Sequence, residues 1–99
     1  MKTIVLGQSS LVASRLAYGC WRIADEPAEA GGAVALMAAY EAGYTLFDGA
    51  DIYGGGKCEE ILGRTVREVA GMRERILVVS KCGVRPAGQP NPQSPGRYD

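Results

Sequence analysis

The sequence predicts an α/β protein with parallel strands, built from consecutive strand–helix units. Three short apolar runs, at 16–20, 45–48 and 76–80, recur at intervals of about 30 residues. Each interval between them holds a segment with helical periodicity. Parallel strands need such helical connections, because a tight turn cannot join two strands that run in the same direction. The pattern therefore indicates a βαβαβ arrangement over residues 15–84.

The first helix is expected between the first two apolar runs. Asp25 is placed to cap it, and Pro27 stands near its first turn. Its predicted apolar face consists of Val34, Met37, Ala38 and Tyr40. Gly43 follows, where a helix commonly ends in a left-handed residue.

The second helix is expected to begin near Lys57 and to end at Gly71. Its predicted buried stripe consists of Ile61, Leu62, Val66 and Val69. Glu60 and Arg64 are four positions apart and belong to the solvated face. The apolar run at 76–80 shows no alternation, which is typical of a strand covered on both faces.

The two ends of the chain differ from its middle. Residues 1–14 predict a β-hairpin, with apolar runs at 4–6 and 11–12 around a turn. Residues 85–99 predict a loop leading toward a next helix, because four of the five prolines fall there and Asp99 resembles an N-cap. Three strands cannot close a barrel and would leave open sheet edges. We therefore expect residues 1–99 to be the N-terminal fragment of one longer domain.

Composition excludes several classes of protein. The chain is 46% hydrophobic and 22% charged, and its eleven basic residues balance its eleven acidic ones. A neutral chain argues against nucleic acid or an anionic membrane as the main partner. No apolar stretch approaches the ~20 residues of a membrane span, and the start lacks a secretory signal. Three widely spaced cysteines without a CxxC pair indicate reduced thiols, a cytoplasmic location and no zinc site.

Residues capable of chemistry stand at the carboxyl ends of the predicted strands. The second strand ends at Asp48, the third at Lys81, and Tyr53 follows Asp48 in the next loop. The first strand ends in Gly19, Cys20, Trp21 and Arg22. Because parallel strands in α/β folds place their active sites at these ends, we expect the residues to share one rim.

An acid, a lysine and a tyrosine on one rim have a chemical logic. The pKa of a free tyrosine is about 10, and a neighbouring ammonium such as that of Lys81 lowers it. A carboxylate such as Asp48 holds the ammonium in place. With its pKa lowered in this way, Tyr53 could protonate the alkoxide that forms when a carbonyl is reduced. The same residues are also compatible with a structural ion pair beside a packed loop tyrosine, so the residues alone leave both interpretations open.

The three consecutive glycines at 54–56 do not form a phosphate-binding motif. The P-loop pattern fails because Cys58 stands where Ser or Thr is required and Asp51 stands where the first Gly belongs. The spacing of the dinucleotide fingerprint and of a calcium loop fails as well. We expect these glycines to bend the loop and carry Tyr53 toward the rim, and we expect no metal site.

The stretch GYTLFDGADIYGGGKCEEILG strongly resembles the N-terminal signature of the aldo-keto reductases. In that family an Asp at the end of the second barrel strand precedes the catalytic Tyr by five residues, and Glu-x-x-aliphatic-Gly follows. Asp48, Tyr53 and residues 59–63 match this pattern in order. LVVSKCG resembles the strand that carries the catalytic lysine. LAYGCWR resembles the first strand, and IVLGQSSLVASRL resembles the hairpin that plugs the barrel's bottom.

The resemblance implies a (β/α)8 TIM barrel, of which this chain would supply the hairpin and the first three βα units. It also implies NADPH-dependent reduction of aldehydes and ketones. Tyr53 would be the general acid, Lys81 would lower its pKa, and Asp48 would pair with Lys81 and face the cofactor. Trp21 and Tyr53 would contact the substrate. The remaining residues expected beside the cofactor are Gly19, Cys20, Trp21 and Arg22.

The chain departs from the family pattern in containing no histidine. The family's fourth catalytic residue, and most contacts to the cofactor, are therefore expected beyond Asp99. The isolated chain is not expected to reduce carbonyls. One alternative is a non-catalytic member that binds a partner or senses nucleotide redox state, as in ion-channel auxiliary subunits. Another is a self-contained small α/β module. The sequence indicates neither the particular substrate nor the oligomeric state.

Overall fold

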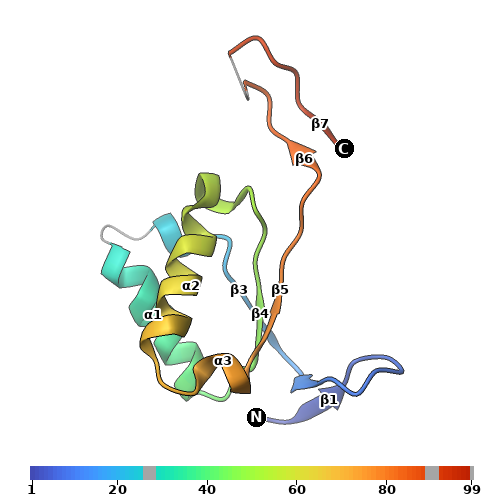
Figure 1. Cartoon of the computed structure of the whole chain (residues 1–99), viewed down its shortest axis with the longest axis vertical. Coiled ribbons are helices and arrows are strands. Elements are labelled where there is room, and N and C mark those ends of the chain that lie inside the picture. Colours follow the sequence, from blue (N-terminus) through green and yellow to red (C-terminus); the bar gives the residue numbers. More distant parts are fainter. Residues whose placement is uncertain (26–28, 89–91, 99) are drawn as a thin grey trace.

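A parallel sheet forms the centre of the computed structural model (Figure 1). The structure describes three stretches of the chain: residues 1–25, 29–88 and 92–98. The neighbouring strands of the sheet, in order, are β3 (Ala17–Gly19), β4 (Leu46–Asp48) and β5 (Leu77–Val79). Both pairings are parallel, so the expected α/β fold with parallel strands in chain order is confirmed.

The helices lie on one side of this sheet (Figure 1). They are α1 (Glu29–Glu41), α2 (Lys57–Glu68) and the short α3 (Met72–Arg75). Two 3-10 turns precede the longer helices in the chain: η1 (Ile23–Asp25) and η2 (Tyr53–Gly56). In the described stretches no helix has the length and apolarity needed to cross a membrane.

The core lies between the sheet and the helices. Phe47, at the middle of the central strand, is fully buried, as are Leu36 of α1 and Met72 of α3. Tyr18 of β3 packs against Phe47 with ring centroids 6.0 Å apart. Burying a side chain of this size stabilises a fold by roughly 1.5–3 kcal/mol, so these contacts join both βα units into one body.

The prediction for the second helix is largely confirmed. It begins at Lys57, and the predicted solvated pair, Glu60 and Arg64, is exposed. Its predicted apolar stripe is buried or half-buried at all four positions: Ile61, Leu62, Val66 and Val69. The helix ends at Glu68 rather than at Gly71. Gly71 instead adopts left-handed backbone, with φ 78°, and precedes α3, which the sequence did not predict.

The predicted apolar face of α1 is wrong at two positions. Val34 is 67% exposed and Ala38 is exposed as well. The buried positions are Gly32, Leu36 and Ala39. Residues 30–40 include no charged side chain, so periodicity could not distinguish the faces of this helix. The close approach of η1 decides the orientation: a Cβ at Gly32 would lie 2.4 Å from the carbonyl oxygen of Ile23.

The expected cap of α1 is also wrong. Asp25 is the last residue of η1, and its carboxylate pairs with the guanidinium of Arg22. The helix itself begins at Glu29. Pro27 lies outside the described residues. At the other end, the prediction for Gly43 is confirmed, since its φ of 102° is left-handed.

The predicted N-terminal hairpin is confirmed. Strands β1 (Thr3–Val5) and β2 (Val12–Ser14) pair antiparallel at the amino-terminal end of the sheet (Figure 1). Two hydrogen bonds attach it to the residue before β4. The Ser14 amide donates to Thr45 Oγ1 at 2.8 Å, and the Thr45 amide donates to Ser14 Oγ at 3.0 Å.

The last part of the chain differs from the prediction in two ways. Strand β5 is an edge of the described sheet, so Val78 and Val79 are each 42% exposed rather than covered on both faces. The expected loop also contains paired backbone, because β6 (Val84–Arg85) and β7 (Arg97–Tyr98) form an antiparallel ribbon. This ribbon projects beyond the carboxyl end of the sheet (Figure 1). Asp99 lies outside the described residues.

Candidate functional site

The carboxyl ends of the parallel strands form the rim on which the candidate residues meet. Gly19, Asp48 and Val79 lie in register across the sheet. Backbone hydrogen bonding continues past the strands, since the Asp51 amide donates to the Lys81 carbonyl at 3.0 Å. This bonding holds Lys81 beside the segment that follows β4.

Lys81 makes two short contacts at the rim. Its Nζ donates to Oδ1 of Asp48 at 2.6 Å and to the carbonyl oxygen of Gly49 at 2.7 Å. Hydrogen bonding to Asp48, supplemented by hydrogen bonding to Tyr53, raises the pKa of Lys81 above its ordinary value. Lys81 is therefore a fixed cation at neutral pH, even though both partners of the pair remain partly exposed.

Tyr53 begins the glycine turn and stands next to Lys81. The ring centroid of Tyr53 lies 5.2 Å from the Lys81 Nζ. The three glycines after it have positive φ angles of 61°, 64° and 100°, a backbone that most other residues avoid. The expectation that the glycines bend this loop is thus confirmed. Their left-handed backbone allows the chain to turn from the tyrosine directly into α2.

Trp21 extends the rim on the other side of Tyr53. Its indole is 63% exposed, and its centroid lies 6.3 Å from that of Tyr53 with an interplanar angle of 42°. The Cys58 thiol donates to the Trp21 carbonyl at 3.4 Å, which attaches the Trp21 backbone to α2. The guanidinium of Arg22 lies 5.8 Å from the indole centroid and pairs with Asp25.

The other two residues expected beside a cofactor differ sharply in accessibility. A Cβ built on Gly19 would meet no atom within 4 Å, so the backbone there is open. Cys20 is only 1% exposed and belongs to the core. Burial, followed by the proximity of Cys58 and Asp48, raises the pKa of the Cys20 thiol to about 11. Its side chain is a neutral core thiol and does not reach the surface of the rim.

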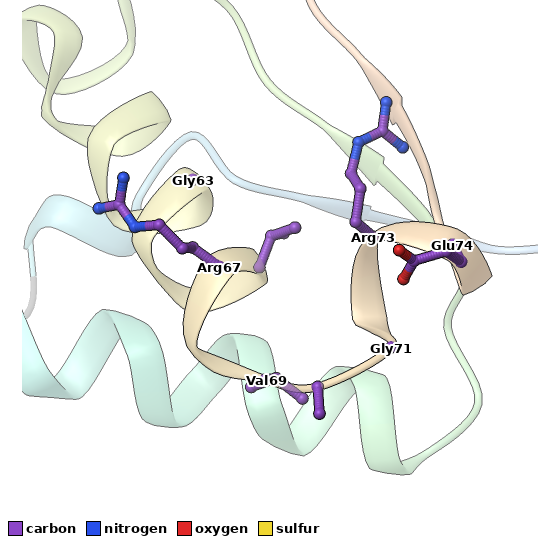
Figure 2. Close-up of a pocket in the computed structure, with 8 residues that line it drawn as sticks. Gly63, Arg67, Val69, Gly71, Arg73 and Glu74 are labelled. Atoms are coloured by element: carbon purple, nitrogen blue, oxygen red, sulfur yellow. The ribbon is translucent and has the colours of Figure 1, made fainter.

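Two hollows in the surface are candidate sites. One of about 160 Å³ adjoins the rim; its lining is Ala50, Asp51, Ile52, Tyr53, Lys81, Cys82 and Val84. Another of about 370 Å³ lies between α2 and α3 (Figure 2), with Arg67 and Arg73 at its border. Figure 2 shows the Arg67 guanidinium directed away from Arg73, so the two cations do not converge. The hollow at the rim is therefore the stronger candidate.

The structure adds two contacts that the sequence did not indicate. The first is the Gly49 carbonyl that accepts from Lys81, and a backbone acceptor leaves no sequence signal. The second is a hydrogen bond of 2.6 Å from Ser80 Oγ to Glu59 Oε2. Nothing in the local sequence predicts that these two side chains meet, although Ser80 directly precedes Lys81 and Glu59 belongs to the stretch after Tyr53.

Comparison with known proteins places these features in context. A model of the family described as "Aldo/keto reductase family" matches residues 15–98. A 6-dehydroglucose reductase from Agrobacterium fabrum is 39% identical over 102 aligned residues, which cover 100% of this chain and 34% of that protein. A probable voltage-gated potassium channel subunit beta from Oryza sativa is 36% identical over 77% of this chain and 24% of its own length.

Solved structures show the same relationship. The holo form of an aldo-keto reductase from Bacillus halodurans superposes with a TM-score of 0.81 at 27% identity, over 100% of this chain and 30% of that one. A glycerol dehydrogenase from Gluconobacter oxydans superposes with a TM-score of 0.79 at 30% identity, over 98% of this chain and 30% of that one. The chain thus spans between about a quarter and a third of the length of the proteins named here.

Proposed function

The chain belongs to the aldo/keto reductase family, and we propose that it supplies the proton-donating part of a cytoplasmic, NADPH-dependent carbonyl reductase. It would contribute the first three βα units of the (β/α)8 barrel, with the remaining units following it. One observation carries the proposal: the Lys81 Nζ lies 2.6 Å from Asp48 Oδ1 and 5.2 Å from the Tyr53 ring centroid.

In the proposed mechanism the Tyr53 hydroxyl is the general acid. It gives its proton to the carbonyl oxygen as negative charge develops there. The Lys81 ammonium stabilises the phenolate that remains, because an adjacent positive charge favours the ionised form of a phenol. Asp48 holds the ammonium in place, and the exposed indole of Trp21 forms a wall against which the substrate packs.

The residues of the rim fit one end of the proposed cofactor. NADPH, when bound, supplies the hydride that reduces the carbonyl carbon. The open backbone at Gly19 would leave room for a flat ring, here the nicotinamide. Arg22 is adjacent but already pairs with Asp25. The rest of the dinucleotide is proposed to contact the part of the barrel that follows residue 99. The family's histidine is proposed to lie in that same part.

A sugar carrying an aldehyde is the proposed substrate class. Two 6-dehydroglucose reductases support it, at 39% identity from Agrobacterium fabrum and 37% identity from Novosphingobium aromaticivorans. A sugar ring presents flat C–H surfaces that suit packing on an aromatic face. The exposed indole of Trp21, next to Tyr53, offers such a face at the rim.

A second candidate function is a non-catalytic subunit that binds a partner or senses nucleotide redox state. The similarity to a probable voltage-gated potassium channel subunit beta favours it. The two functions differ in what the residues of the rim must do. A reductase needs a proton donor there, whereas binding a nucleotide does not require proton transfer. Turnover of a carbonyl substrate separates them.

The test uses the protein in which this chain is followed by the rest of its barrel. NADPH oxidation is measured with 4-nitrobenzaldehyde and with a dialdehyde sugar. We expect saturable turnover, and a loss in kcat of about 10²- to 10⁴-fold for Tyr53→Phe, the usual range for removing a general acid. Tyr40→Phe is the matched control, because Tyr40 lies on α1 and contacts Arg75 instead. Full activity in Tyr53→Phe would exclude the mechanism. Nucleotide binding without any turnover would favour the non-catalytic subunit.

A further inference from the structure

The hydrogen bond between Ser80 and Glu59 connects the two segments that carry the proposed catalytic residues. We propose that this bond is a brace that positions Lys81, and that Glu59 and Ser80 are therefore positioning residues of the rim. The inference rests on the function proposed above, because it assigns a role to two side chains that do not themselves reach the reacting atoms.

The contacts around Lys81 show how such a brace would act. Ser80 Oγ donates to Glu59 Oε2 at 2.6 Å, while Lys81, the next residue, donates to Asp48 and to the Gly49 carbonyl. Two adjacent side chains are thus held by two different elements, α2 and the end of β4. Holding Ser80 restricts rotation of the backbone from which Lys81 projects.

The position of Glu59 links the brace to Tyr53. Glu59 lies in the first turn of α2, which begins directly after the turn Tyr53–Gly56. A carboxylate at a helix N-terminus is stabilised by the helix dipole, and a hydrogen bond to a charged acceptor is short and comparatively strong. The brace therefore fixes the spacing between the segment that carries Tyr53 and the segment that carries Lys81.

Packing alone gives this part of the chain little support. Ser80 and Lys81 lie beyond the end of β5, which is Val79, and both are exposed on the rim. In the complete barrel a further strand would pair with β5, but the rim beyond the strand end would still lack buried contacts. Where few buried contacts hold a segment, its hydrogen bonds determine its position. Removing the brace is expected to let Lys81 move away from both Asp48 and Tyr53.

The test measures the pH dependence of alcohol oxidation by the complete protein with NADP⁺. In this direction a base on the rim must take the proton of the alcohol, so the rising limb of the pH profile reports the electrostatics of the rim around Lys81. In Glu59→Ala and in Ser80→Ala we expect the limb to move to higher pH and kcat to fall roughly tenfold, with the KM for NADP⁺ unchanged. If Glu59 and Ser80 contributed only to the stability of the fold, the rising limb of the pH profile would stay at its wild-type position.

Matched variants complete the design. Glu60→Ala removes the neighbouring, exposed carboxylate of the same helix and is expected to keep the wild-type profile. Ser80→Thr keeps the hydroxyl and is expected to keep the wild-type profile as well. The double variant Glu59→Ala/Ser80→Ala is expected to resemble each single variant, since both remove the same bond. If Glu59→Ala has the same rising limb and the same kcat as the wild type, the proposal of a brace is overturned.

Failure of the brace and failure of the proposed function are distinguishable. If the wild type oxidises alcohols and Tyr53→Phe does not, the function stands whatever Glu59→Ala does. If the wild type shows no turnover, the titration of Lys81, followed by NMR of isotopically methylated lysines, decides instead. Loss of contact with Asp48 lowers the pKa of Lys81, so a lower value in Glu59→Ala supports the brace and an unchanged value overturns it.

Discussion

The Lys81 Nζ lies 2.6 Å from Oδ1 of Asp48, although 33 positions separate the two residues in the chain. The contact depends on the parallel register of β4 on β5, in which Asp48 stands opposite Val79. A slip of one residue would turn the side chains of one strand to the opposite face. The electrostatics of the rim is therefore a consequence of sheet register.

The titration of Lys81 gives a first prediction. Hydrogen bonding to Asp48 raises the pKa of Lys81 above its ordinary value of 10.5, so Asp48→Asn should lower it. A raised lysine pKa means that the pair stabilises the fold fully at neutral pH and loses this contribution only as pH rises through the raised value. NMR of isotopically methylated lysines measures the shift. Asp51→Asn is the control, because the contact of Asp51 with Lys81 uses its backbone amide.

The three thiols should react at very different rates. Cys82 is exposed, whereas Cys20 and Cys58 are buried. The pKa of Cys20, raised by burial from 9.0 to about 11, leaves roughly a hundredfold less thiolate than an unperturbed thiol would have. A titration with Ellman's reagent should show one fast thiol, which Cys82→Ser removes. Fast labelling of Cys20 at the same pH would contradict the buried position assigned to it.

Two neighbouring glycines form a matched pair for stability. Gly54 and Gly55 have nearly equal φ angles of 61° and 64°, so alanine at either position incurs a left-handed penalty of about 1–2 kcal/mol. At Gly54 the new Cβ would also lie 3.0 Å from Ala24 Cβ and 3.1 Å from Cys58 Sγ, whereas Gly55 has open space. In urea unfolding, Gly54→Ala should cost about 1 kcal/mol more than Gly55→Ala. Equal costs would show that the turn shifts freely.

The open edge of the sheet predicts self-association of the isolated chain. Val78 is 42% exposed on β5, which is the edge strand of the described sheet. Exposed apolar edge strands pair with other chains, and a lysine on the edge suppresses such pairing. Sedimentation velocity should show concentration-dependent association that Val78→Lys reduces. Val34→Lys makes the same change at an exposed helical site; an equal effect there would indicate non-specific apolar contact instead of strand pairing.

Local patterns in the sequence were enough to predict the N-terminal hairpin, the three parallel strands, the two longer helices and the positions of Asp48, Tyr53 and Lys81 on the rim. Gly43 predicted a left-handed residue and the glycines at 54–56 predicted a sharp bend, and their φ angles confirm both. The apolar stripe of α2 was predictable because charged residues occupy its opposite face. Asp48, Tyr53 and Lys81 followed from their positions at strand ends, since parallel strands bring their carboxyl ends together. Their catalytic roles stay a prediction.

Tertiary structure decided what no local pattern contained. Residues 30–40 of α1 carry no charged side chain, so the buried face of this helix was settled by the approach of η1 to Gly32. The exposure of Val78 and Val79 follows from the place of β5 at the sheet edge. The bond between Ser80 and Glu59 joins residues 21 positions apart. The sequence by itself determined where the hairpin, the three parallel strands and the two longer helices form, because those depend largely on neighbouring residues. Which faces are buried, and which side chains meet, depends on distant segments that only the folded sheet brings together.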